Sequence, residues 1–140
     1  MSVFSFRKDE ILRKNKLIEQ LFAEGNSFFI HPFKVFYLVT PLETTYPVQI
    51  LITVGKRVFR FAVKRNRVKR QIREVYRLNK HTLYEHLAGQ KKQCVLAIIY
   101  TSNNHIPTED LDIKIKAVVN RLLKEFDKNL NKPSHSLSVI

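Results

Sequence analysis

The feature that most constrains the fold of this chain is a long basic stretch near its middle. Residues 56–73 hold nine lysines and arginines and no acid. Val68, Ile72 and Val75 recur at i, i+4 and i+7, the spacing of one apolar face of a helix. The basic and amide positions that fall together on another face are Asn66, Lys69, Arg70, Arg73 and Arg77. The stretch therefore predicts a helix that is anchored by its apolar face and presents a charged ridge.

A ridge of this kind is either a solvated face with no partner or a binding surface, and a negatively charged partner is favoured because like charges at i, i+4 repel each other. The net charge of +13 and the pI near 10.1 favour the same conclusion for the whole chain. A membrane surface is the weaker candidate, since the apolar run at 94–100 is too short to span a bilayer and the first ten residues do not form a signal peptide. Phosphates of a nucleic acid would relieve the repulsion.

Hydrophobic periodicity predicts one α+β domain over residues 1–130, with a disordered tail at 131–140. A first helix should run from a cap at Asn15 to a stop at Gly25, followed by a short strand before Pro32. Strands at 33–39 and 48–54, a long helix at 62–86, a strand at 93–100 and a last helix capped by Thr108 should follow. The order α-β-β-β-α-β-α gives a four-stranded sheet packed with three helices. The expected core face of the last helix is Leu111, Ile115, Val118, Val119, Leu122 and Phe126.

The acidic residues do not suggest a catalytic or metal site in the protein itself. Metal-dependent phosphodiester cleavage requires clustered carboxylates, and most acids here are scattered. Glu109, Asp110 and Asp112 do cluster, but they open a helix, where acids favour the helix dipole. The single cysteine, Cys94, sits in an apolar run and is expected to be a buried thiol in a reduced, cytoplasmic protein.

The basic stretch also resembles a known signature, that of the protein subunit of bacterial ribonuclease P. The signature is a basic pair after a strand, an Arg-Asn-Arg core, then Lys-Arg and a further Arg. The matching residues here are Lys56, Arg57, Arg65, Asn66, Arg67, Lys69, Arg70 and Arg73. The resemblance covers residues 10–127 and includes Lys14, Asn15, Phe22 and Gly25 of the first helix. One departure is the turn at 58–61, which is one residue longer than the glycine-containing turn usual in the family.

The resemblance implies that the chain is the protein component of a ribonucleoprotein whose catalyst is RNA. That enzyme removes the 5′ leader from precursor tRNA, with Mg²⁺ held by the RNA, so no protein-bound cofactor, metal or protein partner is expected. The basic residues implied to bind the catalytic RNA are Lys56, Arg57, Arg60, Lys64, Arg65, Asn66, Arg67, Lys69, Arg70 and Arg73. The single-stranded leader would lie in a cleft formed by Phe22, Lys34, Phe36 and Ile18, where the family often has an aromatic residue in place of Ile18. The family fold also implies a left-handed strand-helix-strand crossover around the basic helix, against the usual hand.

Two other functions share the charge and size of this chain. A non-enzymatic protein that binds structured RNA, such as a ribosomal protein, would have a similar composition. A DNA-binding basic helix of the leucine-zipper type is a poorer match, because Leu78, Leu83 and Leu87 do not form a heptad repeat.

Overall fold

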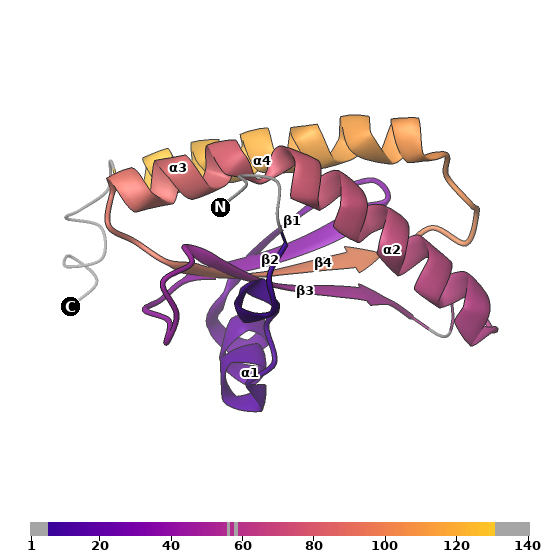
Figure 1. The fold of residues 1–140 in the computed structure, drawn as a ribbon, viewed down its shortest axis with the longest axis horizontal. Helices are drawn as coiled ribbons and strands as arrows, with labels where there is room; N and C mark the ends of the chain where they lie inside the picture. The colour runs from indigo at the N-terminus through magenta and orange to yellow at the C-terminus, as the bar shows by residue number, and fades with distance from the viewer. Residues whose placement is uncertain (1–5, 56, 58, 131–140) are drawn as a thin grey trace.

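The protein is built around one four-stranded sheet with helices on both of its faces (Figure 1). The computed structural model describes residues 6–55, 57 and 59–130, with side chains up to residue 127. The strands are β1 (Asn26–Ile30), β2 (Phe33–Val39), β3 (Val48–Val54) and β4 (Cys94–Tyr100). Their order is β1-β2-β4-β3, with β4 antiparallel to β2 and parallel to β3. This arrangement confirms the expected α+β class.

The helices divide unequally between the two faces of the sheet. A short 3-10 helix, η1 (Lys8–Glu10), precedes α1 (Asn15–Glu24), and α2 (Ala62–Asn79), α3 (His81–Gly89) and α4 (Thr108–Leu130) come later in the chain. Figure 1 shows α2, α3 and α4 as a layer on one face and α1 alone on the other. Most of one sheet face is thus covered, whereas the other is covered only where α1 crosses it.

The alternation of side chains along β2 explains why two separate cores form. Phe33, Val35 and Tyr37 are buried in the large core under the helical layer. Phe36 and Leu38, on the opposite face, pack against the small core that α1 covers. The apolar stripe expected on the last helix is confirmed, because all six of its positions in α4 are buried, and Cys94 is buried as expected.

Three expected helix boundaries are wrong. The helix expected at 62–86 is two helices, α2 and α3, separated at Lys80. At the break the Asn79 amide donates to the Val75 carbonyl and to Asp112 of α4, both at 2.7 Å, so tertiary contacts override local helix propensity. Asn15 and Thr108 are the first residues of α1 and α4 rather than their caps. The expected stop at Gly25 is confirmed, since its N–H closes the helix on the Leu21 carbonyl at 2.9 Å.

A buried ion pair ties the N-terminal segment to the junction between α2 and α3. The Lys80 ammonium donates to the Glu10 carboxylate, and their side chains are 3% and 0% exposed. The Tyr84 hydroxyl donates to the same carboxylate oxygen at 2.5 Å, and the Arg7 N–H donates to the other oxygen at 2.5 Å. The Leu12 N–H then donates to the Ile50 carbonyl of β3 at 2.9 Å. These contacts place the start of α1 beside the β3 edge of the sheet.

The connection from β3 to β4 carries the basic stretch. These two strands are parallel neighbours, so the chain between them must cross over the sheet, and α2 and α3 make that crossover. Its left-handed sense stays a prediction from the resemblance. Residues 131–140, expected to be a disordered tail, lie outside the described residues.

Candidate nucleic-acid interface

Residues 62–73 of the basic stretch form the first three turns of α2, which is fixed to the sheet as the sequence predicts. Val68, Ile72 and Val75 are 2%, 0% and 1% exposed and belong to the large core. Tyr76 is buried beside them, and α2 packs on both α4 and β3. This anchoring leaves the other sides of the helix to the charged residues.

Five cations on this part of α2 have no acidic partner among the residues that the structure describes. They are Lys64, Arg67, Lys69, Arg70 and Arg73. All are exposed except Lys69, which is half-buried, and Asn66 is exposed among them. Because α2 is fixed to the sheet, these charges cannot move apart, and the ridge keeps a strong positive potential.

The ridge is shorter than the sequence pattern suggests. The Arg77 guanidinium donates to Glu74 through Nη2 at 2.6 Å and through Nε at 3.2 Å. These hydrogen bonds lower the pKa of the Glu74 carboxyl below its ordinary value and raise the pKa of Arg77. Arg77 is therefore paired, and the unpaired part of the ridge ends at Arg73.

Arg65 differs from the other predicted RNA-binding residues. Its Nη1 donates to the carbonyls of Phe59 and Arg60 at 2.8 and 2.9 Å, and its side chain is half-buried. Arg65 therefore holds the turn before α2, although the sequence pattern groups it with the ridge. Arg57 and Arg60 are exposed on that turn, and Lys56 lies outside the described residues.

The four residues predicted to form the leader cleft gather between α1 and the sheet. The rings of Phe22 and Phe36 meet edge to face, with centroids 4.8 Å apart. The Lys34 ammonium lies 5.6 Å from the centroid of Phe36. Ile18, one turn before Phe22, packs against the small core. Phe22 is 41% exposed, so an aromatic surface and a cation are open to solvent together.

A second feature beside the ridge was not predicted from the sequence. A hollow of about 250 Å³ lies between the start of α2 and the loop that follows β4. Its walls are Phe59, Lys64, Arg67, Val68, Asn103, Asn104 and His105. The Tyr100 hydroxyl donates to the Asn104 carbonyl at 2.5 Å and so fixes the loop. The only sequence signal was the run of polar residues at 101–105, which did not indicate where the loop would lie.

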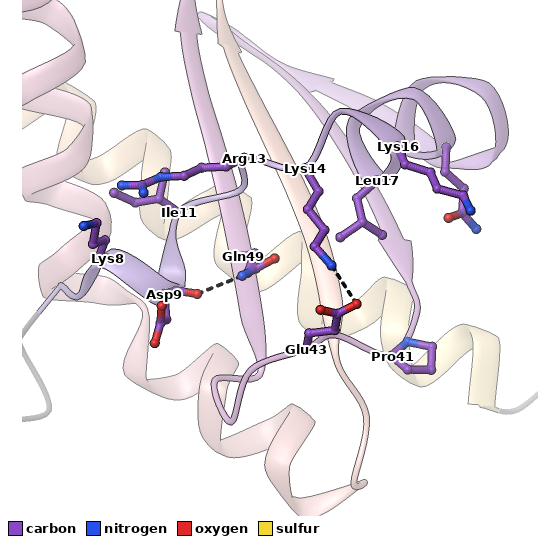
Figure 2. A pocket seen from close by; sticks show the side chains of 11 residues that line it. Lys8, Asp9, Ile11, Arg13, Lys14, Lys16, Leu17, Pro41, Glu43 and Gln49 are labelled. Carbon is purple, nitrogen blue, oxygen red and sulfur yellow. Dashed lines mark hydrogen bonds and ion pairs between the residues drawn. The ribbon is translucent and has the colours of Figure 1, made fainter.

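Another hollow, of about 360 Å³, lies at the opposite end of β3 from the basic turn (Figure 2). Lys14 pairs with Glu43 at 2.6 Å across it, and the Gln49 amide donates to the Asp9 carbonyl at 2.9 Å. Figure 2 shows the Gln49 side chain reaching from its strand toward Asp9 and the Lys14–Glu43 pair beside it. Because carboxylates take part in its wall, this hollow attracts anions less strongly than the ridge does.

The described residues hold no cluster of three or more His, Cys, Asp or Glu side chains arranged to bind a metal ion. Of the acids that open α4, Asp112 forms an ion pair with Lys116 at 2.8 Å and accepts a hydrogen bond from the Asn79 amide. No described helix is long and apolar enough to cross a membrane.

Comparisons with known proteins identify the family of this chain and agree with its fold. A family model described as Ribonuclease P matches residues 6–126. A ribonuclease P protein component from Porphyromonas gingivalis is 37% identical over 102 residues, which are 73% of this chain and 74% of that protein. A ribonuclease P protein component from Dictyoglomus thermophilum is 35% identical over 129 residues, which are 91% of this chain and 94% of that protein.

Solved structures show the same fold. The RNase P protein from Thermotoga maritima matches 80% of this chain and 96% of its own with a TM-score of 0.62 at 22% identity. A Staphylococcus aureus RNase P protein mutant with defective mRNA degradation activity matches 82% of this chain and 89% of the mutant chain, with a TM-score of 0.64 at 20% identity. Because the family model spans most of the chain and relatives above 30% identity cover more than two thirds of it, the chain belongs to the ribonuclease P protein family.

Proposed function

We propose that this chain is the protein component of a bacterial ribonuclease P, acting in the cytoplasm in the removal of 5′ leaders from precursor tRNA. In this proposal the catalytic RNA holds the Mg²⁺ and hydrolyses the phosphodiester bond. The protein binds that RNA through α2 and the single-stranded leader through the cleft beside α1. The observation that carries the proposal is a row of cations on a fixed helix that have no acidic partner among the described residues, in a chain of this family.

The ridge suits the phosphates of a folded RNA for two physical reasons. Arginine guanidinium groups bind phosphate oxygens in a bidentate manner, and Arg67, Arg70 and Arg73 have no competing carboxylate among the described residues. Neutralising each phosphate also releases condensed counterions, which makes binding favourable and dependent on salt. A helix held by a packed core loses little entropy when it binds, so this free energy is not spent on ordering it.

The cleft suits a single strand better than a duplex. The Phe22 and Phe36 rings offer apolar faces and edges to an unstacked base, and Lys34 lies close enough to meet the neighbouring phosphate. α1, which borders the proposed cleft, and α2 lie on opposite faces of the sheet (Figure 1). We therefore propose that the two surfaces contact different RNA segments, so that a substitution in one leaves binding at the other intact.

Salt dependence of binding to a bacterial ribonuclease P RNA tests the ridge. Arg67→Ala or Arg70→Ala should weaken binding and lower the log-log salt slope by somewhat under about one unit each. Arg77→Ala is the matched control on the same helix, because its charge is already paired with Glu74, and it should keep the wild-type slope. Unchanged slopes in both ridge variants would remove the ridge from the interface.

Leader capture tests the cleft and separates this function from that of a general structured-RNA-binding protein. The wild-type complex with the catalytic RNA should bind precursor tRNA more tightly than mature tRNA. Phe36→Ala should keep the affinity for the catalytic RNA but lose much of this preference. Equal binding of precursor and mature tRNA by the wild type would favour the structured-RNA alternative, and a Phe36→Ala defect independent of leader length would refute the cleft assignment.

A further inference from the structure

The turn that distinguishes this chain from the family pattern is firmly held at Phe59. The Phe59 ring stacks on Tyr100 of β4, with centroids 6.1 Å apart and planes 19° apart. Arg65, one turn into α2, donates to the carbonyls of Phe59 and Arg60. The Phe59 N–H also donates to the Gly55 carbonyl at 3.3 Å. Phe59 and Arg60 are therefore fixed by ring stacking and by hydrogen bonds.

The same turn displays its second aromatic residue to solvent. Phe61 is 63% exposed, and Val63, two residues later, is 78% exposed. Phe61 sits at the N-cap of α2, where its carbonyl accepts the Arg65 N–H at 3.3 Å and its side chain makes no capping bond. The backbone of Phe61 is thus fixed, whereas its ring lies outside the hydrophobic core of the described protein. Phe61 and Val63 therefore leave apolar surface open to a binding partner.

The surroundings of Phe61 indicate what it binds. The Arg60 guanidinium lies 5.8 Å from the centroid of the ring. Arg57, Arg60 and Lys64 are exposed around the turn, and no described carboxylate pairs with them. Rings placed among unpaired cations are the pattern of surfaces that stack bases and hold phosphates. A ring can stack on a base face only where that base is not already stacked in a helix.

We propose that Phe61 is a stacking platform for an unpaired base of the catalytic RNA, with Arg60 and Lys64 holding the flanking phosphates. This inference rests on the proposed function and adds a contact that the ridge alone does not supply. The cations of the ridge contact phosphates, which occur all along the RNA. Stacking on Phe61 instead requires an unpaired nucleotide at a fixed place in the RNA. Phe61 thereby sets the register of α2 on the RNA, and Arg65 acts as its positioning residue.

The absence of tryptophan from the chain makes the test direct. In Phe61→Trp the new indole is the only tryptophan, and titration with a bacterial ribonuclease P RNA should quench its fluorescence as a base stacks on it. Ile113→Trp is the matched control, because Ile113 is 61% exposed on α4, away from the basic turn. Its fluorescence should stay close to that of the free protein.

Affinity measurements on Phe61→Ala complete the test. Binding should weaken by about 5- to 100-fold, the range for removal of a base-stacking aromatic, with the salt slope unchanged because no charge is lost. Ile113→Ala should bind as the wild type does. Far-ultraviolet circular dichroism of the variants should match the wild type, since the exposed ring contributes nothing to the core.

Each outcome decides the inference. If Phe61→Ala binds the RNA as tightly as the wild type does, and the RNA does not quench the indole of Phe61→Trp, the stacking role is overturned. The proposed function is then unaffected. Failure of the wild type to bind the RNA at all would overturn both. Self-association of the wild type that disappears in Phe61→Ala, seen by sedimentation without RNA, would assign the ring to a protein interface and overturn the inference as well.

Discussion

Replacing Glu10 by glutamine should strongly destabilise the fold, although Glu10 lies far from α2 in the sequence. Glu10 and Lys80 are almost completely buried, and the carboxylate accepts hydrogen bonds from the Lys80 ammonium, the Tyr84 hydroxyl and the Arg7 N–H. Glutamine keeps the shape of the side chain but removes the negative charge. The Lys80 ammonium then remains in the core opposite a neutral amide.

The expected loss in the free energy of unfolding is about 3–5 kcal/mol, the usual cost of removing one partner from a buried ion pair. For a domain of this size that corresponds to a fall in Tm of about 10–20 °C. Urea unfolding should therefore show a lower midpoint with an unchanged m-value. Removing both charges, in Glu10→Gln with Lys80→Met, should cost less than the sum of the two single changes, with a coupling free energy of about 1–3 kcal/mol.

An exposed ion pair in the same chain provides the control. Lys14 and Glu43 pair at 2.6 Å with side chains 54% and 84% exposed. Glu43→Gln should leave the urea midpoint unchanged within error, because solvent screens such a pair. If Glu10→Gln also leaves the midpoint unchanged, or if the two changes are merely additive in the double variant, the buried pair does not hold the N-terminal segment in place.

Three further predictions follow from packing and from titration. Burial raises the pKa of the Cys94 thiol to about 12, so thiol reagents should modify it in urea but not in the native protein. Gly25→Ala should destabilise the fold by about 1–3 kcal/mol, because a Cβ would press on the Leu21 carbonyl and lie 2.9 Å from the Tyr37 carbonyl, whereas Gly89→Ala, with nothing within 4 Å, should not destabilise it. Hydrogen bonds, chiefly from Lys116, lower the folded-state pKa of Asp112, so its stabilising contribution is present above the unfolded pKa near 3.8 and is lost as pH falls through the lower folded value. Asp112→Asn should therefore lose less stability than the wild type on acidification below about pH 4, as followed by thermal unfolding.

Local patterns in the sequence were sufficient for the strands and for the anchored face of α2. The β2 and β3 boundaries were predicted at Phe33–Val39 and Val48–Val54, because prolines and turn residues bracket both runs. Val68, Ile72 and Val75 are buried as their spacing predicts, since period 3.6 is a local property of any helix that packs on a sheet.

The features that escaped prediction depend on partners distant in sequence. The break at Lys80 arises because Asn79 reaches α4 and Lys80 reaches Glu10, and neither partner can be read from helix propensity. The role of Arg65 was hidden for a related reason. The Arg65 guanidinium binds backbone carbonyls of the preceding turn, but an arginine that binds phosphate would look the same in the sequence. Helical spacing alone cannot distinguish these two roles.

The resemblance and the residues contributed different parts of the candidate site. The resemblance suggested the cleft, and the structure brings Phe22 and Lys34 close to the ring of Phe36 between α1 and the sheet. Helical spacing suggested the ridge, and the structure limits its unpaired part to residues before Glu74. The polar loop at 103–105 was missed, because its position beside Lys64 and Arg67 depends on the parallel pairing of β3 and β4.

Cleavage of a precursor tRNA by a bacterial ribonuclease P RNA at low Mg²⁺, with and without this protein, tests the central claim most directly. The RNA alone should cleave poorly there, because phosphate repulsion between enzyme and substrate RNA is left unscreened. Addition of the protein should restore cleavage at the correct 5′ position, and Arg70→Ala should restore less of it than Arg77→Ala. Tight binding of the protein without any rescue, with RNA from a close bacterial relative as well, would contradict the account and favour a structured-RNA-binding protein of another kind.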